Sequence, residues 1–432
     1  MSRSIDDHAA AVCDALAHGY DAAVAGLELP LARARGRVLA RDLTAPISLP
    51  PFTNSQMDGF AVRSSEFRRT PDGEGNVTLP VSGTQAAGAA PSALAPGTAM
   101  AVMTGAALPA GADAVIPVER VTPSSFDTDR ITVTAENAAT IDPGTFVRAE
   151  GSDVERGSVA LPAGTTLGPA ALGACAALGL DGAATVTVRN GPAVLVVTGG
   201  DEVLAAGQPL EPGAIYDANG PLLEAWLEEA GAFSVTTLSV TDDPEEFSRR
   251  LRKAVAGAAP HLIITSGGIS AGAFEVVRVT LEREAQMWFG HVAMQPGGPQ
   301  GLGVYRDVPV VCLPGNPVST WVSCEMFLRP ALADVWGCCT PPRWASAVLA
   351  EPVRGLPGRT QLRRGVLETT DDAAREPVVR CVGGASSHLL MSAARANVLL
   401  RIPAGANELT SGTRVQILPV SGGAIRQETA SE

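Results

Sequence analysis

The sequence predicts a multidomain protein in which a doubly wound α/β domain is combined with β-rich domains. The first observation is size: the chain has 432 residues, of which 46% are hydrophobic, enough for more than one core. The second is the content of 46 glycines and 33 prolines, which argues against a coiled coil or an all-helical array. The third is an alternation of strand and helix patterns in the middle of the chain.

The N-terminal half indicates a helix followed by a small β-rich domain. Ser4 to Asp7 resembles a capping box, and Val12, Leu16 and Tyr20 continue one apolar stripe that needs a partner. From about residue 49 to residue 148, short β-prone runs are separated by turn residues. We therefore expect an amphipathic helix and then a β domain inserted into the chain.

The α/β pattern begins at about Pro192. Apolar runs at Val194 to Val197 and at Leu262 to Ile264 are separated by helical spacings, which predicts a parallel sheet with helices on both faces. Ligands bind such sheets beyond the carboxyl ends of the strands, so we expect functional residues just after these runs and after Leu313. Beyond Pro341, short strand-like runs without a helical period predict a small β-barrel.

Composition excludes several classes of function. The formal net charge is −13 and no basic stretch is present, which argues against non-specific nucleic-acid binding. Lys253 is the only lysine, which excludes a mechanism that needs two lysines. The seven cysteines lack a C-x-x-C pair and the five histidines share no ligand spacing, so neither zinc nor a disulfide framework is indicated. No signal-peptide pattern or membrane-length apolar run occurs, and we expect a cytoplasmic protein.

Two motifs contain carboxylates. In residues 51–62, Asp58-Gly59 lies between apolar residues; taken alone, such a pair is most often a β-turn. Asp201 and Glu202 follow the first strand of the α/β domain, and Asp217 comes shortly before the next helix. Three carboxylates near one strand end suit Mg²⁺, which prefers oxygen ligands. Asp217 could equally cap the helix.

Two other segments are suited to a phosphate. Thr265 to Gly272 links a buried strand to a helical pattern, so backbone N–H groups and serine hydroxyls would meet at the positive end of a helix. In Pro314 to Ser319, Asn316 is a plausible N-cap and Pro317 the first helical residue, which would direct further N–H groups into the same crevice. The structural alternatives are a tight glycine turn and an ordinary helix cap.

In this order the motifs resemble those of the molybdopterin molybdenumtransferases, the molybdenum-insertase family that includes the E domain of gephyrin. The resemblance covers nearly the whole chain and also rests on Met103 to Ala106, Gly151 to Val154, Gly358 to Thr360, Arg364-Gly365 and Ser387-His388. It implies four parts: an elongated, discontinuous dimerisation domain (1–48 and 149–190), an inserted β-rich domain (49–148), an α/β molybdopterin-binding domain (191–338) and a C-terminal β-barrel (339–432).

The resemblance also implies an activity, the Mg²⁺-dependent insertion of molybdate into adenylylated molybdopterin, which releases AMP and molybdenum cofactor. It assigns catalytic roles to Asp58, Asp153, Asp217 and Glu275, and magnesium binding to Asp201, Glu202 and Asp217. The implied substrate-binding residues are Ser55, Gly59, Thr104, Thr198, Gly199, Asn219, Ser266, Gly267, Gly268, Ser270, Gly272, Pro314, Gly315, Asn316, Pro317, Ser319, Arg364 and Ser387. The implied partner is a second copy of the chain in a homodimer, in which Asp58 and Asp153 of one copy would complete the site of the other. Transient partners would be the molybdopterin adenylyltransferase and molybdoenzymes. Neither nucleic acid nor a membrane is expected as a partner.

Some positions depart from the family pattern. Gln295 and Gly298 stand where members usually carry lysines, Glu275 replaces an aspartate and Arg278 a lysine. Losing two cations near an anionic ligand would weaken its binding. Two alternatives to a working insertase therefore stay open: a relative with altered specificity or low activity, and a non-catalytic dimeric scaffold. The motifs around Asp58 and Arg364 disfavour a third, an amidase or phosphatase that shares only the pterin-domain fold.

Overall fold

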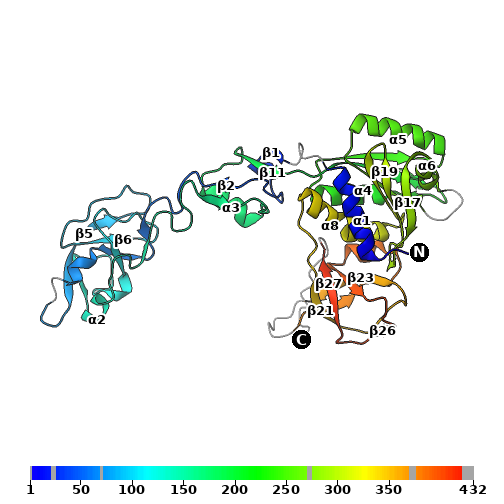
Figure 1. Cartoon of the computed structure of the whole chain (residues 1–432). Coiled ribbons are helices and arrows are strands. Elements are labelled where there is room, and N and C mark those ends of the chain that lie inside the picture. The colour runs from blue at the N-terminus through cyan, green and yellow to red at the C-terminus, as the bar shows by residue number, and fades with distance from the viewer. Residues whose placement is uncertain (1, 21–25, 69–71, 270–274, 369–375, 421–432) are drawn as a thin grey trace. The chain divides into compact units, whose positions relative to one another are not determined.

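A computed structural model describes residues 2–20, 26–68, 72–269, 275–368 and 376–420 (Figure 1). These residues form two compact units. One consists of residues 29–35 and 41–186, and the other of residues 1–28, 36–40 and 187–432. The short strands β1 (Gly26–Pro30) and β11 (Thr185–Arg189) each span a point where the chain passes from one unit to the other.

The unit around residues 41–186 contains the predicted β domain, a five-stranded sheet with an apolar core around Phe60, Ile116 and Ile131. Its strands, in sheet order, are β7 (Ala114–Pro117), β4 (Gly59–Val62), β6 (Ala99–Val102), β5 (Val77–Gln85) and β8 (Arg130–Val133). Shorter elements are β2 (Leu43–Thr44), β3 (Asn54–Ser55), α2 (Ala135–Ala138), β9 (Val147–Arg148), β10 (Val159–Leu161) and α3 (Pro169–Ala177).

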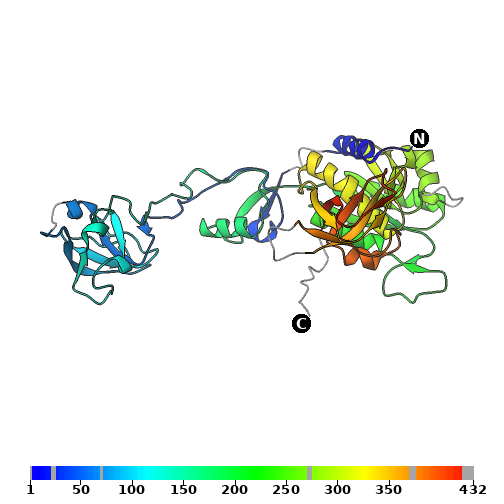
Figure 2. The same cartoon turned by 90° about the horizontal axis from the view of Figure 1, so that it is seen from below.

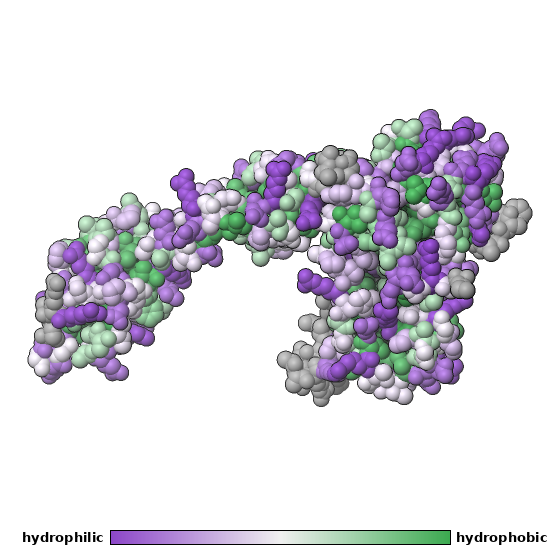
Figure 3. Space-filling model, viewed as in Figure 1, coloured by the Kyte–Doolittle hydropathy of each residue, from purple (hydrophilic) through white to green (hydrophobic). Residues whose placement is uncertain are grey.

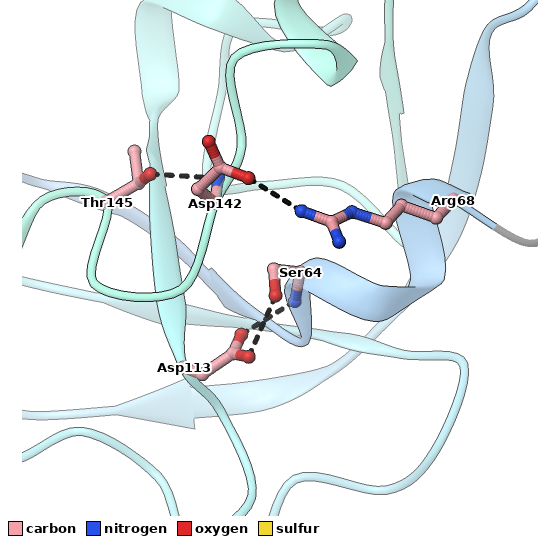
Figure 4. Close-up of polar contacts among 5 residues, drawn as sticks. All are labelled: Ser64, Arg68, Asp113, Asp142 and Thr145. Carbon is pink, nitrogen blue, oxygen red and sulfur yellow. Dashed lines mark hydrogen bonds and ion pairs between the residues drawn. The ribbon is translucent and has the colours of Figure 1, made fainter.

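Carboxylates fix the turns of this β domain (Figure 4). Asp113 accepts hydrogen bonds from the backbone N–H and the hydroxyl of Ser64, at 2.6 and 2.8 Å. Asp142 accepts from Arg68 at 2.7 Å, and its own backbone N–H donates to the Thr145 hydroxyl at 3.0 Å. The Asp113 contacts are partly buried, whereas Arg68 and Asp142 are exposed to water, which weakens that ion pair.

The other unit is built on a six-stranded sheet. In sheet order the strands are β15 (Ser234–Val240), β12 (Ala193–Gly199), β16 (Leu262–Ser266), β20 (Val308–Leu313), β19 (Pro299–Tyr305) and β17 (Gln286–His291). The first four are parallel, as predicted, whereas β19 and β17 are antiparallel. The predicted parallel sheet is therefore mixed at one edge, because no helix separates β17 from β19 or β19 from β20 in the chain.

Successive side chains of β12 show that helices cover both faces. Val194 and Val196 pack with α4 (Asn219–Glu229), whereas Leu195 and Val197 pack with α5 (Pro244–Ala258) and α6 (Val276–Glu284). The predicted two-faced arrangement is confirmed. Figure 3 shows hydrophilic residues over α5 and α6, consistent with the exposed basic residues of α5.

The N-terminal helix α1 (Ile5–His18) is part of this unit. Ser4 caps it by accepting a hydrogen bond from the backbone N–H of Asp7 at 3.0 Å. Its apolar stripe finds its partner here, because Val12 and Leu16 are buried in the same core as Val194. The expected bounds of the elongated domain include residues 1–48, whereas in the structure this helix packs on the α/β sheet.

A continuous helical segment follows β20 and leads to the barrel. It consists of α7 (Pro317–Ser323), a π-helical turn (Cys324–Leu328), α8 (Arg329–Ala331) and a second π-helical turn (Leu332–Trp336), and it ends at Gly337 with φ of 59°. A left-handed residue at this point is a common way to end a helix.

The C-terminal strands close into the predicted small barrel (Figure 2). Its strands, in sheet order, are β18 (Met294–Gln295), β23 (Thr360–Glu368), β24 (Val378–Cys381), β21 (Ala345–Leu349), β27 (Arg414–Pro419) and β25 (Val398–Ile402), and pairing of β23 with β25 completes the closure. The remaining elements are β22 (Val353–Arg354), β26 (Glu408–Leu409) and α9 (Leu390–Ala394). Within the described ranges, no helix has both the length and the apolar character needed to cross a membrane.

Candidate functional site

Asp217 lies at the carboxyl end of β12, as predicted. It follows β14 (Ile215–Tyr216), which pairs with β13 (Val203–Leu204). One carboxylate oxygen accepts from the hydroxyl of Thr198 at 2.7 Å, and the other accepts from the backbone N–H groups of Asn219 and Gly220, both at 2.9 Å. Asp217 therefore satisfies the first two backbone N–H groups of α4, although Ala218 is the N-cap residue, and the same contacts fix its carboxylate beside the end of β12.

The other two predicted magnesium ligands do not join Asp217. Asp201 is exposed and exchanges backbone-to-side-chain hydrogen bonds with Asp242, at 3.2 and 3.3 Å, and Glu202 is also exposed. In the described part of the chain, no group of three or more histidine, cysteine or acidic side chains is arranged to hold a metal. The prediction of a preformed three-carboxylate set is therefore not met, because Asp201 is held by the loop after β15 while Asp217 is held by α4.

The two phosphate-binding segments lie against each other. The hydroxyl of Ser266 donates to the carbonyl of Pro314 at 3.1 Å and lies 3.0 Å from the hydroxyl of Thr320. A Cβ atom added at Gly315 would lie 3.2 Å from the Cα of Gly267, so the two loops approach each other closely at these glycines. Gly267 and Gly268 both have positive φ, at 96° and 65°, as expected of a loop that turns its backbone toward a ligand.

Several predicted residues frame these loops. Pro317 is the first residue of α7 with Asn316 before it, and Ser319 is buried; Glu275 immediately precedes α6. Gly199 is left-handed and its backbone touches Val240, so only glycine fits there. Ser270 and Gly272 lie outside the described residues.

Asn219 joins the crevice from α4. Its side-chain amide donates to the carbonyl of Gly315 at 2.7 Å, so the loops after β14 and β20 are in contact. Its Oδ1 atom is buried and has no hydrogen-bond partner among the described residues. A buried acceptor without a partner is costly unless a ligand or an ion satisfies it.

Arg364 on β23 is a buried cation without a carboxylate partner in the described structure. One terminal nitrogen donates to the carbonyl of Gly384, while Nε and the other terminal nitrogen are buried and unpaired. Burial and the neighbouring Arg363 lower the pKa of this guanidinium. Ser387, half-buried, lies three residues beyond Gly384, before α9, and α9 packs on α7. The barrel thus holds a buried guanidinium, two of whose nitrogens have no partner among the described residues.

In the other unit, Asp58 is exposed and held by Thr104. One carboxylate oxygen accepts from the backbone N–H and the hydroxyl of Thr104, at 2.6 and 2.7 Å, and these bonds lower the pKa of Asp58. Gly59 is the first residue of β4 rather than part of a β-turn, so the turn interpretation was wrong. A Cβ atom at Gly59 would lie 2.0 Å from the carbonyl oxygen of Ile116, which explains the glycine.

Two more predicted residues lie in the same unit. The Ser55 hydroxyl donates to the carbonyl of Met57 at 2.6 Å and fixes the approach to Asp58. Asp153 is exposed, and its backbone N–H donates to the carbonyl of Leu49 at 2.9 Å. The structure therefore divides the predicted carboxylates between two units, with Asp58 and Asp153 in one and Asp217 in the other.

Sequence reasoning missed two polar residues. Thr320 connects Ser266 to the start of α7, and its position one turn into a predicted helix was the available signal. Gln361 donates to the side-chain oxygen of Gln295 at 2.6 Å, so an amide pair occupies one of the positions where the family usually has lysine. No local pattern connects these two glutamines, because they meet through the pairing of β18 with β23.

Comparison with known proteins identifies the family. Three family models match in chain order: the MoeA N-terminal region (domains I and II) over residues 3–179, a probable molybdopterin binding domain over residues 195–334 and the MoeA C-terminal region (domain IV) over residues 346–420. Molybdopterin molybdenumtransferase 2 of Mycobacterium tuberculosis is 40% identical over 424 residues, which cover 96% of this chain and 99% of that protein.

Further relatives agree with this assignment. Molybdopterin molybdenumtransferase of Haemophilus influenzae is 32% identical over 395 residues, covering 90% of this chain and 93% of that protein. The crystal structure of a molybdopterin biosynthesis MoeA protein from Pyrococcus horikoshii matches 97% of this chain and 99% of its own, with 27% identity and a TM-score of 0.71. The chain belongs to the MoeA family of molybdopterin molybdenumtransferases.

Proposed function

We propose that this chain inserts molybdate into adenylylated molybdopterin in the cytoplasm and releases AMP and molybdenum cofactor. The observation that carries the proposal is the contact between three loops, after β14, β16 and β20, at the carboxyl ends of the parallel strands. Asn219 bonds to Gly315, and Ser266 bonds to Pro314, so these loops form a single surface. Family membership over nearly the whole chain supports the same activity.

The crevice offers donors for the pyrophosphate of the substrate. Backbone N–H groups at the start of α7 and in the loop of Gly267 and Gly268 would bind phosphate oxygens at the positive end of a helix. Such donors are needed in a chain whose net charge is −13, because its side chains as a whole repel an anionic substrate.

The residues fit a magnesium ion that is completed by the substrate. The Asp217 carboxylate and the Oδ1 of Asn219, the first residue of α4, would supply two oxygen ligands. Magnesium sites commonly use one or two protein oxygens, several waters and substrate phosphates, so a three-carboxylate cage is not required. When bound, the ion would neutralise charge on the phosphate being cleaved. Asp217 would hold it, with Asp201 and Glu202 as ligands only if their loop turns toward the crevice.

Arg364 is the proposed contact for molybdate. Two of its nitrogens are buried and unpaired, and a guanidinium presents its donors as a planar fork suited to an oxyanion. Binding an anion here would give the buried charge the counterion that the described structure lacks. Ser387 would add a hydroxyl donor on the same loop as Gly384.

We further propose that Asp58 and Asp153 complete the site in a homodimer. Hydrogen bonds from Thr104 favour the ionised form of Asp58, which is the form needed to accept a proton or to hold water near the phosphate. Both carboxylates are exposed on their unit and are therefore available to a second copy. Transient contacts with the molybdopterin adenylyltransferase and with molybdoenzymes would deliver the substrate and receive the product.

The test uses purified protein with adenylylated molybdopterin, molybdate and Mg²⁺. We expect release of AMP together with formation of molybdenum cofactor, and loss of both when Mg²⁺ is chelated. Asp217→Asn should remove activity, whereas Asp14→Asn, an exposed aspartate on α1, should not. Absence of AMP release from correctly folded protein would overturn the proposal and favour the scaffold alternative.

The pair of glutamines at positions 295 and 361 supports the alternative of altered specificity. The Gln295–Gln361 pair is neutral, so any anion bound nearby meets hydrogen-bond donors and acceptors instead of a positive charge. The test replaces Gln295 with lysine and compares the concentration of molybdate that each protein needs for half-maximal activity. It distinguishes a fully active insertase from a relative with altered specificity. A large decrease for Gln295→Lys would show that the natural chain binds molybdate weakly.

A further inference from the structure

A cavity of about 520 Å³ lies away from the crevice, between the helical segments and the barrel. It is lined by α1, by the segment from Glu325 to Asp334, by the connection around Pro341 and Trp344 and by the barrel strands β25 and β27. Figure 1 shows α1, α8 and β27 next to one another in this part of the chain. None of its lining residues belongs to the candidate site, and its volume is within the range of small-molecule sites.

The walls of the cavity are mostly apolar. Its lining includes Ile5, Met326, Pro341, Trp344 and Leu418, of which Ile5, Met326 and Leu418 are otherwise buried in the core. Apolar and aromatic surface of this kind favours a ligand with a hydrocarbon or aromatic body, because its burial removes apolar area from water.

Of the three carboxylates that line the cavity, one is paired with an arginine and two are not paired with a cation among the described residues. Glu325 is neutralised, since its carboxylate accepts two bonds from Arg329, at 2.6 and 3.0 Å, and one from Trp226 at 2.7 Å. Asp334 accepts from the thiol of Cys13 at 3.3 Å, and neither Asp334 nor Asp6 has an ion pair among the described residues.

The cation at the cavity comes from the barrel wall. Arg401 lies over the ring of Trp344, 5.9 Å from its centroid. Among the described residues, the helical wall therefore carries two carboxylates without a cationic partner, while the guanidinium of Arg401, stacked on an aromatic ring, lies on the other side. Because Arg329 neutralises Glu325, the remaining charges at the cavity are those of Asp6, Asp334 and Arg401, and their sum is negative.

We propose that this cavity binds a small amphipathic amine, with its apolar body against Trp344 and its ammonium group between Asp6 and Asp334. An ammonium there donates charge-assisted hydrogen bonds to two exposed carboxylates, and an aromatic body gains contact with the proline and tryptophan walls. An anion of the same shape would meet those carboxylates instead and would be repelled. The binding is independent of molybdenum insertion.

Three compounds with the same phenyl body test the proposal: phenethylamine, phenylalanine and 3-phenylpropanoate. Titration of the full chain, followed by NMR or calorimetry, should give tightest binding for phenethylamine and at least about tenfold weaker binding for 3-phenylpropanoate, as one charge-assisted contact implies. Tighter binding of phenylalanine or of the anion would overturn the proposal, because either result would make Arg401 the anchor. Failure of phenethylamine to bind at millimolar concentration would also overturn it.

Variants locate the site. Asp6→Asn combined with Asp334→Asn should remove the preference for the amine, and Trp344→Ala should weaken all three ligands. Asp14→Asn, on the same helix but outside the cavity, is the matched control and should bind as the natural chain does. Unchanged amine binding in the double variant, with its helical content intact by circular dichroism, would place the ligand elsewhere and refute the assignment.

Discussion

Histidine 8 should make the docking of α1 sensitive to acid. Its side chain is completely buried between aromatic rings, with the Phe327 ring edge-on at 4.7 Å and the Trp288 ring at 5.3 Å. Arg3 lies 3.4 Å from its Nδ1 atom, and its Nε2 atom has no partner among the described residues. Burial, and secondarily the charge of Arg3, lower the pKa of His8 from 6.5 to about 4.

The sign and size of the effect follow from that shift. His8 is neutral while α1 is docked, whereas the histidine of an undocked helix takes up a proton below pH 6.5. The stabilisation of the docked helix is therefore complete above pH 6.5 and is lost as the pH falls toward 4. Between about pH 7.5 and about pH 5 the loss amounts to about 2 kcal/mol, since each unit of pKa difference is worth about 1.4 kcal/mol.

The assay is hydrogen exchange of the α1 backbone amides at the two pH values, corrected for the intrinsic exchange rate. Protection should fall about thirtyfold in the natural chain on acidification and should change little in His8→Gln. His18→Gln is the matched control, because His18 is an exposed histidine at the end of the same helix. Equal pH dependence in His8→Gln and the natural chain would refute the reasoning.

Two further predictions concern residues of the candidate site. Arg364→Met should abolish cofactor formation yet raise the melting temperature, because it removes a buried and incompletely paired charge; a lower melting temperature would contradict this. Gly59→Ala should destabilise the β domain by about 2 kcal/mol or more in urea unfolding, since the added carbon would lie 2.0 Å from a carbonyl oxygen of β7, and an unchanged midpoint would contradict it.

The sequence predicted those features that depend on local patterns. Alternating residues of β12 contribute to two cores, and glycine-containing loops follow the buried strands β16 and β20, so the sheet, its helices and the place where the loops meet were expected from periodicity. The order of the motifs along the chain then indicated the family, which the comparisons confirmed.

Features set by tertiary contacts could not be read in the same way. The direction of Asp201 depends on a hydrogen-bond exchange with Asp242, and the Gln295–Gln361 pair depends on how β18 meets β23. The apolar stripe of α1 indicated that a partner exists without indicating which sheet supplies it. These contacts join residues that are far apart in the chain, where spacing carries no information.

We propose that carboxylates from the two units act together in one active site formed by two copies of the chain. Asp58→Asn and Asp217→Asn, each inactive alone, are co-expressed with different tags, and the mixed dimer is isolated and assayed for AMP release. A site shared between copies leaves one intact pair in each mixed dimer and should restore about half of the natural activity. A mixed dimer that is correctly folded and inactive would contradict the claim.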